Sequence, residues 1–191
     1  FVPEGHMANF IRDVVTESLD LKAIFASYKG PKGFPPFDPS MMTSLLLYAY
    51  SVGVFSSRKI AKACEDRMDF LAITGIDRPD FRTIAEFRRR HFDALGDLFV
   101  HVLKLCQKAG LVKLGHVALD GTKVRANASK HKAMSYRRML ETEKRLRKEI
   151  AEWFAKAEAA DQSEDDSFGR KHRGDELPEW VRVKEARLKR I

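Results

Sequence analysis

The chain has 191 residues, of which 44% are hydrophobic, and its 35 Lys and Arg residues against 27 Asp and Glu residues give a formal net charge of +8. This length and apolar content allow one or two small domains with real cores, and no apolar run reaches the roughly 18–20 residues of a membrane-spanning helix. A basic balance favours polyanionic partners, although charge alone does not choose between DNA, RNA and an anionic membrane surface.

The positive charge is concentrated in two segments. Residues 121–156 contain 11 basic and 4 acidic residues, and residues 56–91 contain 9 basic and 6 acidic residues. We therefore expect two separate basic surfaces.

The two cysteines, Cys64 and Cys106, have no second Cys or His at metal-ligand spacing, so they are interpreted as reduced core thiols in a cytoplasmic protein. No apolar segment of a signal peptide follows the start. Because the sequence opens on Phe1 rather than Met, we expect it to be part of a longer reading frame.

The first 38 residues predict an N-terminal arm. Apolar residues at helical spacing indicate a helix over 6–18 and a short one over 20–28. The Gly- and Pro-rich stretch 30–36 predicts a loop that leads to the next unit.

Residues 39–112 predict a compact unit of short helices with tight turns. Ser40 is the expected N-cap of a helix over 41–52, Ser56 or Ser57 that of a helix over 58–66, and Asp80 that of a helix ending at His91. Between them we expect a helix over 68–74 that Gly75 ends, and after them a helix over 94–109. Short helices joined in this way are typical of helix-turn-helix modules.

The pattern changes after residue 112. Asp120-Gly121, flanked by alternating apolar residues, predicts a β-hairpin over 116–127 within a segment 113–132. A long helix is expected over 133–160, with an apolar seam of Met139, Leu146, Ile150, Trp153 and Ala157. Residues 161–177 are polar and predicted to be mobile, and a last helix is expected over 179–191.

Candidate nucleic-acid contacts lie on two of the short helices. They are Arg58, Lys59 and Lys62 on one helix and Arg82, Arg88 and Arg89 on the other. Such side chains contact phosphates, with one or two reaching base edges. The alternative is a solvated helix face, and consecutive arginines cannot all face one way.

A second set of cations, Lys123, Arg125 and Lys130, lies near Asp120. Lys123 and Arg125 alternate with apolar residues and so share one strand face. If Asp120 holds a metal ion, these cations would meet a DNA backbone. The alternative is that the cations only make the long helix soluble. We prefer this alternative for the basic residues of 144–148. Asp120 itself could simply be a turn residue.

The motifs occur in an order typical of one family. The first group of motif residues lies in the helical unit: Pro39, 45–47, Tyr50, Gly53 and 57–58, followed by 79–80, 83–84 and 87–88. The second group lies around Asp120, at 119–124 and 126–129. This ordered set resembles bacterial insertion-sequence transposases of the DDE class, from the N-terminal DNA-binding domain to the first catalytic strand.

The resemblance implies a helical domain that binds the double-stranded DNA of terminal inverted repeats, followed by a ribonuclease-H-like fold. Two Asp and one Glu of that fold hold divalent ions, Mg²⁺ or Mn²⁺, for in-line attack on a phosphodiester. Asp120 matches the first of these carboxylates as catalytic residue and metal ligand. The later Asp and Glu have no match here, so we expect this chain alone neither to cut DNA nor to hold the ions stably.

The sequence therefore predicts a mainly α fold: a helix-turn-helix-like domain, a β-hairpin that starts a ribonuclease-H-like fold, and a long helical insertion over 133–191. The favoured function is that of a truncated transposase bound to DNA in the bacterial nucleoid. A non-enzymatic DNA-binding remnant is the second interpretation. A module that forms a homodimer or another protein contact through the long helix is the third.

Overall fold

The computed structural model describes residues 2–28, 37–108 and 136–176. This part of the chain forms eight helices and no strand, which confirms a mainly α protein. The helices are α1 (Met7–Ser18), α2 (Lys22–Ala26), α3 (Pro39–Ser51), α4 (Ser57–Asp66), α5 (Met68–Thr74), α6 (Phe81–Arg90), α7 (Phe92–Lys108) and α8 (Tyr136–Phe168). The predicted hairpin at 116–127 and the predicted last helix at 179–191 lie outside the described residues. Among the helices that the structure describes, none is long and apolar enough to cross a membrane.

Several helix ends follow from local residue chemistry. Ser56 accepts a hydrogen bond from the Lys59 amide (3.2 Å), Asp80 accepts one from the Arg82 amide (2.9 Å), and Gly75 ends α5 with a positive φ of 60°. The prediction of Ser40 as the cap of α3 was wrong. Asp38 accepts from the Met41 amide at 2.9 Å, and α3 then begins at Pro39, whose fixed φ suits a first helical turn.

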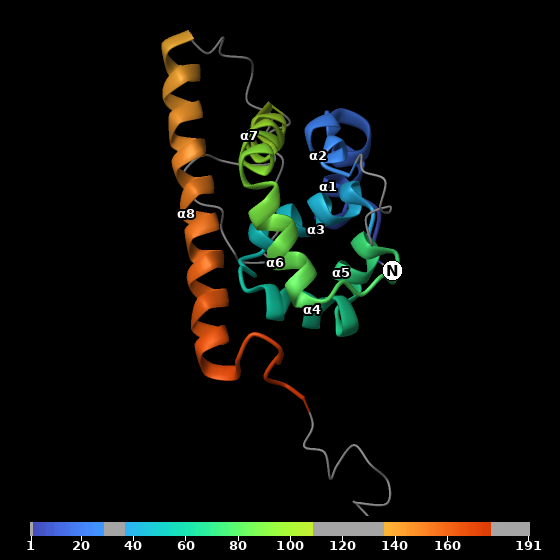
Figure 1. Cartoon of the computed structure of the whole chain (residues 1–191). Coiled ribbons are helices and arrows are strands. Elements are labelled where there is room, and N and C mark those ends of the chain that lie inside the picture. Colours follow the sequence, from blue (N-terminus) through green and yellow to red (C-terminus); the bar gives the residue numbers. More distant parts are fainter. Residues whose placement is uncertain (1, 29–36, 109–135, 177–191) are drawn as a thin grey trace, which may run out of the picture.

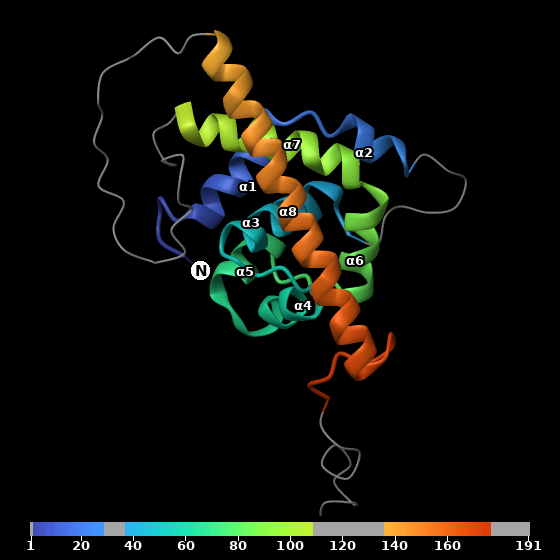
Figure 2. The same ribbon diagram turned by 90° about the vertical axis from the view of Figure 1, so that its left-hand side faces the viewer.

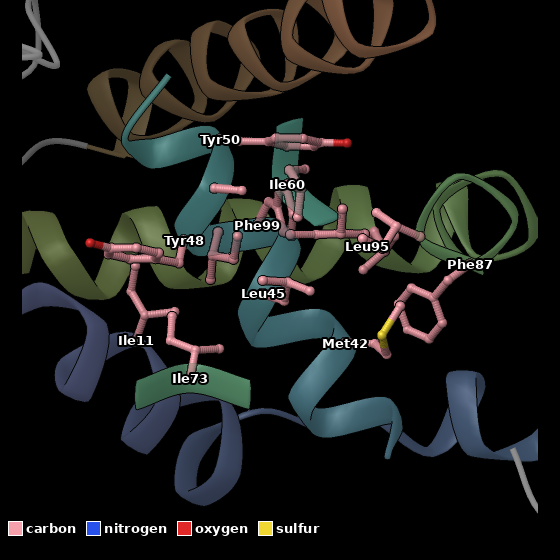
Figure 3. Packing of buried hydrophobic residues seen from close by; sticks show 14 of the residues in the cluster. Ile11, Met42, Leu45, Tyr48, Tyr50, Ile60, Ile73, Phe87, Leu95 and Phe99 are labelled. Atoms are coloured by element: carbon pink, nitrogen blue, oxygen red, sulfur yellow. The ribbon is translucent and has the colours of Figure 1, made fainter. Parts of the chain in front are cut away.

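Helix α3 is the centre of the molecule. Every residue from Met42 to Tyr50 is buried, so the helix has no solvent face. The two hydroxyls in this stretch donate to carbonyls of their own helix, Thr43 to Pro39 and Ser44 to Ser40, each at 2.8 Å. Figure 3 shows residues of α3 between side chains that other helices supply.

The N-terminal arm shares this core. Helix α1 packs against α3 and α5, and its residues Ala8, Ile11 and Val15 are buried together with Ile24 of α2. Figure 3 shows Ile11 beside Ile73 of α5. Residues 2–28 are therefore a layer of the helical unit rather than a separate arm.

The core also accounts for one of the two cysteines. Cys64 is a free, fully buried thiol, as predicted, and burial raises its pKa to about 12. A thiol with that pKa stays protonated at neutral pH and is a poor nucleophile. The side chain of Cys106 lies outside the described residues.

Helix α8 runs along one side of the other helices and packs chiefly against α7 (Figures 1 and 2). Its apolar stripe is buried at Leu146, Ile150, Phe154 and Ala157. The Phe154 ring lies 4.7 Å from that of Phe92, 5.6 Å from that of Phe99 and 5.9 Å from that of Tyr50. The apolar seam predicted from the sequence is thus used within one chain.

The prediction that α8 ends near residue 160 and that residues 161–177 are mobile was wrong for the part described. Helix α8 continues to Phe168, and Asp161 is 7% exposed. Polar composition indicated disorder, but these polar groups are held by partners on α4 and α6, as shown below.

Truncation of Phe154 tests whether α8 belongs to the core. Phe154→Ala removes a ring in contact with three others, so we expect a loss of about 3–5 kcal/mol in the free energy of unfolding. Urea denaturation followed by circular dichroism measures it. The control is Glu152→Ala, at an exposed position of α8, with an expected change under about 0.5 kcal/mol. Equal, small effects would mean that α8 is not docked.

Candidate nucleic-acid interface

Helices α4 and α6 pack directly on each other and carry six of the predicted nucleic-acid contacts. Both are amphipathic, with apolar residues such as Ile60 and Ile84 fully buried. Their remaining positions face either solvent or α8. Which of these two surroundings each cation has decides what it can bind.

Arg88 lies at the interface of α6 with α8 and is only 2% exposed. Its guanidinium donates to Glu158 at 2.6 Å and to the Ser57 hydroxyl at 3.3 Å, and it lies 3.0 Å from the carboxylate of Asp161. Burial opposes its charge, but the electrostatic attraction of surrounding groups, Tyr50 and Asp161 above all, outweighs it and raises the Arg88 pKa. Arg88 is therefore a buried cation that partners from α8 stabilise.

Arg58 of α4 is likewise a buried cation, and its partners lie at the end of α8. It is 4% exposed and donates to the Asp165 carboxylate at 2.7 Å. It also donates to the carbonyls of Gly169 and His172, each at 2.9 Å, and its guanidinium lies 4.4 Å from the centre of the Phe81 ring. These contacts hold the turn after α8 against α4.

The first turn of α4 binds carboxylates of α8 directly. Asp161 accepts hydrogen bonds from the Ser57 amide (2.7 Å) and the Ser57 hydroxyl (2.6 Å), and Glu164 accepts one from the Ser56 hydroxyl (2.5 Å). The N-terminus of a helix attracts anions because its first amides lack helical partners and the helix dipole is positive there. The acidic end of α8 thus occupies an anion-binding surface formed by α4 and α6.

Residues after α8 continue this contact. Arg173 bonds to Glu65 of α4 and to Asp175, and its hydrogen bond lowers the pKa of Glu65. The amides of Arg173 and Gly174 donate to Glu176 and lower its pKa to about 2. Residues 169–176 are therefore an ordered turn.

Two of the predicted nucleic-acid contacts are therefore buried within the chain. Arg58 and Arg88 were expected to contact phosphates, but in this structure their donors are directed at carboxylates and carbonyls of residues 158–172. The helical phase gives the physical reason: position 88 follows Phe81 and Ile84 on the buried face of α6. On α8, the acidic residues at 158, 161 and 165 are spaced three and four apart and so share one helix face. This spacing was the sequence pattern that could have indicated the partners of the two arginines.

The other predicted contacts on α4 and α6 are exposed. Lys62 lies 3.5 Å from Glu65 and 3.8 Å from Asp175, and Arg82 lies 2.8 Å from Asp80. Arg89 is 54% exposed, with carboxylates no closer than 3.9 Å among the described residues. Lys59 is exposed and forms no ion pair within the described part of the chain. These four cations remain accessible to an external anion.

The remaining predicted site residues, Asp120, Lys123, Arg125 and Lys130, lie outside the described residues. Their proposed roles remain predictions. Among the residues that the structure does describe, no group of three or more His, Cys, Asp or Glu side chains could hold a metal ion.

Replacing Arg88 tests its role as a buried cation. Arg88→Met keeps most of the side-chain volume but leaves Asp161 without its cation, so we expect a loss of about 3 kcal/mol in the free energy of unfolding. The matched control is Arg89→Met on the exposed side of the same helix, with an expected change within about 0.5 kcal/mol. Chemical denaturation compares the two, and equal stabilities would contradict the proposed ion pair.

Comparison with known proteins relates the first 90 residues to one protein family. Residues 1–90 match the family model with the description "Transposase domain (DUF772)". No curated protein and no solved structure matches the chain. The matched segment ends with α6 and so includes both Arg58 and Arg88, whereas their partners on α8 lie beyond it. The first 90 residues are thus similar to the transposase domain of this family, which supports a transposase.

Proposed function

We propose that this chain is the DNA-binding part of an insertion-sequence transposase and that it recognises the terminal inverted repeats of its element. The match of residues 1–90 to a transposase domain carries the proposal. That segment coincides with helices α1 to α6, which form one packed unit around α3.

The geometry of α6 supports contact with duplex DNA. Asp80 caps its start, and its ten residues give a rod about 15 Å long, which fits the major groove of B-DNA. Its exposed positions carry Arg82, Glu86, Arg89 and Arg90. In helix-turn-helix proteins an amphipathic helix of this kind enters the groove while neighbouring helices contact the backbone.

The exposed cations of α4 would supply backbone contacts. Lys59 and Lys62 project from the helix that packs beside α6. Phosphate contacts fix register and add affinity without reading sequence, and they make binding depend steeply on salt. Glu86 and Asp80 reduce the net positive charge of this face, so we assign most of the affinity to a few cations rather than to a strongly basic surface.

We further propose that the parent transposase belongs to the DDE class and uses Asp120 as its first metal-binding carboxylate. This step rests on the sequence motifs at 119–124 and 126–129. The divalent ions of such a site activate the attacking oxygen and stabilise the leaving one. Lys123, Arg125 and Lys130 would lie against the DNA backbone beside it.

The interpretation as a protein-interaction module has less support. It required the apolar seam of α8 to be free, and Leu146, Ile150 and Ala157 are buried inside the chain. A non-enzymatic remnant that competes for the same DNA ends is compatible with the same interface, and it differs only in the catalytic segment.

Charge removal tests the proposed DNA interface. The variant Lys59→Gln/Arg82→Gln/Arg89→Gln should weaken binding to inverted-repeat duplex at least about tenfold and flatten the log–log salt slope by roughly 0.9 per lost phosphate contact. Fluorescence anisotropy across a salt series, with scrambled duplex as competitor, measures both quantities.

The control removes equal charge elsewhere. Lys144→Gln/Arg145→Gln/Lys148→Gln neutralises three exposed cations near the start of α8, and it should change affinity only a few-fold through net charge. Equal losses in both variants would contradict the assigned face. A second outcome would contradict DNA recognition by α4 and α6: the wild-type chain binds inverted-repeat and scrambled duplex equally weakly, and Lys59→Gln/Arg82→Gln/Arg89→Gln does not change that binding.

A further inference from the structure

The acidic end of α8 presents four carboxylates to α4 and α6. Glu158, Asp161, Glu164 and Asp165 lie on the side of α8 that faces α4 and α6, and each contacts a cation or a hydroxyl there.

The groups that these carboxylates bind are those that bind phosphate in other proteins. The surface offers two guanidinium groups, two serine hydroxyls and one amide at the first turn of α4. Arginine forks and helix N-termini bind carboxylates and phosphates by the same hydrogen-bond geometry. Because Arg58 and Arg88 are only 4% and 2% exposed, an anion must accompany them, and a DNA phosphate could replace a carboxylate in that role.

The acidic end can separate while the rest of α8 remains docked. The buried apolar residues of α8 end at Ala157, and beyond it Asp161 is the one buried residue within the described part of the helix. From Glu158 onward the contact consists of ion pairs and hydrogen bonds. Such polar contacts can exchange partners, whereas the Phe154 contacts cannot open without exposing the core.

We propose that residues 158–172, the acidic end of α8 and the start of the turn that follows it, are a built-in competitor of DNA: they cover Arg58, Arg88 and the first turn of α4, and they are displaced when the backbone of duplex DNA binds there. The inference rests on the proposed DNA-binding function. It makes Arg58 and Arg88 conditional phosphate contacts, which become available after displacement, in addition to the exposed cations.

Selective neutralisation of α8 tests the competition. Asp161→Asn/Asp165→Asn keeps one acceptor oxygen at each position, for the Ser57 amide and for Arg58, but removes two charges. The control Glu149→Gln/Glu152→Gln removes two charges from the same helix at residues that form no ion pair within the described part of the chain. We expect the first variant to bind inverted-repeat duplex roughly tenfold more tightly than the control. Equal affinities would overturn the proposal.

Loss of folding must be distinguished from loss of competition. If thermal denaturation shows that the double Asn variant is unfolded, Glu158→Gln/Glu164→Gln, at the other two acidic positions of the same contact, replaces it with the same expectation. Tighter binding in either folded variant supports the proposal, and affinity equal to the control overturns it.

Hydrogen exchange of the wild-type chain separates this proposal from DNA binding itself. If DNA displaces the acidic end, amides of residues 158–168 should exchange faster in the complex, while those of residues 146–157 stay protected. Specific DNA binding with unchanged exchange in 158–168 would overturn the competition and leave the proposed function standing. Failure of the wild-type chain and of the neutralised variants to bind duplex at low salt would reject both.

Discussion

The buried ion pairs of Arg58 and Arg88 with the end of α8 are the constraint on which the arrangement of this molecule depends. A guanidinium removed from water needs an anionic partner with good geometry, and here the partners come from 107 and 70 residues away in sequence, at Asp165 and Glu158. An apolar stripe alone would tolerate sliding of one helix along another. Specific donors that must meet specific carboxylates fix which turn of α8 meets which turn of α4, so their effect is on register more than on net stability.

That register joins three segments into one body. Helix α3 is buried on all sides, and it needs α1 and α5 on one flank and the aromatic contacts of Tyr50 with Phe99 and Phe154 on another. The division into an arm, a DNA-binding unit and an insertion therefore describes the order of the sequence better than it describes the packing. Residues 2–28 and 136–168 cover faces of α3 and α7 that would otherwise be exposed and apolar.

Local chemistry made the short helices predictable. Ser56, Asp80 and Gly75 act within one turn of themselves, so their effects are visible in a few consecutive residues. Helix α3 is capped by Asp38 rather than by Ser40. Asp and Ser are both good caps, and Pro39 favours Asp38 because proline suits the first helical position that follows the cap. Arg88 could not be placed in the same way: its position on the apolar face of α6 was visible, but its carboxylate partners were not, because they lie in a segment whose composition suggested disorder. The residues around Asp120 lie outside the described part, so that interpretation still rests on motif order alone.

The same ion pairs bear on how the charge of this chain relates to binding. A net charge of +8 suggests a strong electrostatic attraction to nucleic acid, yet two of the best-placed guanidinium groups are neutralised within the molecule, and Lys62 and Arg82 have acidic neighbours. A shortened chain that ends before α8 would lose the carboxylates that neutralise Arg58 and Arg88 and would expose aromatic groups such as Phe99. Its affinity for any polyanion would then reflect unpaired buried cations and exposed apolar surface as much as recognition. The electrostatic character of the α4–α6 face is therefore a property of the chain with α8 in place, and α8 has to be counted as part of the proposed DNA-binding unit even though it contributes negative charge to it.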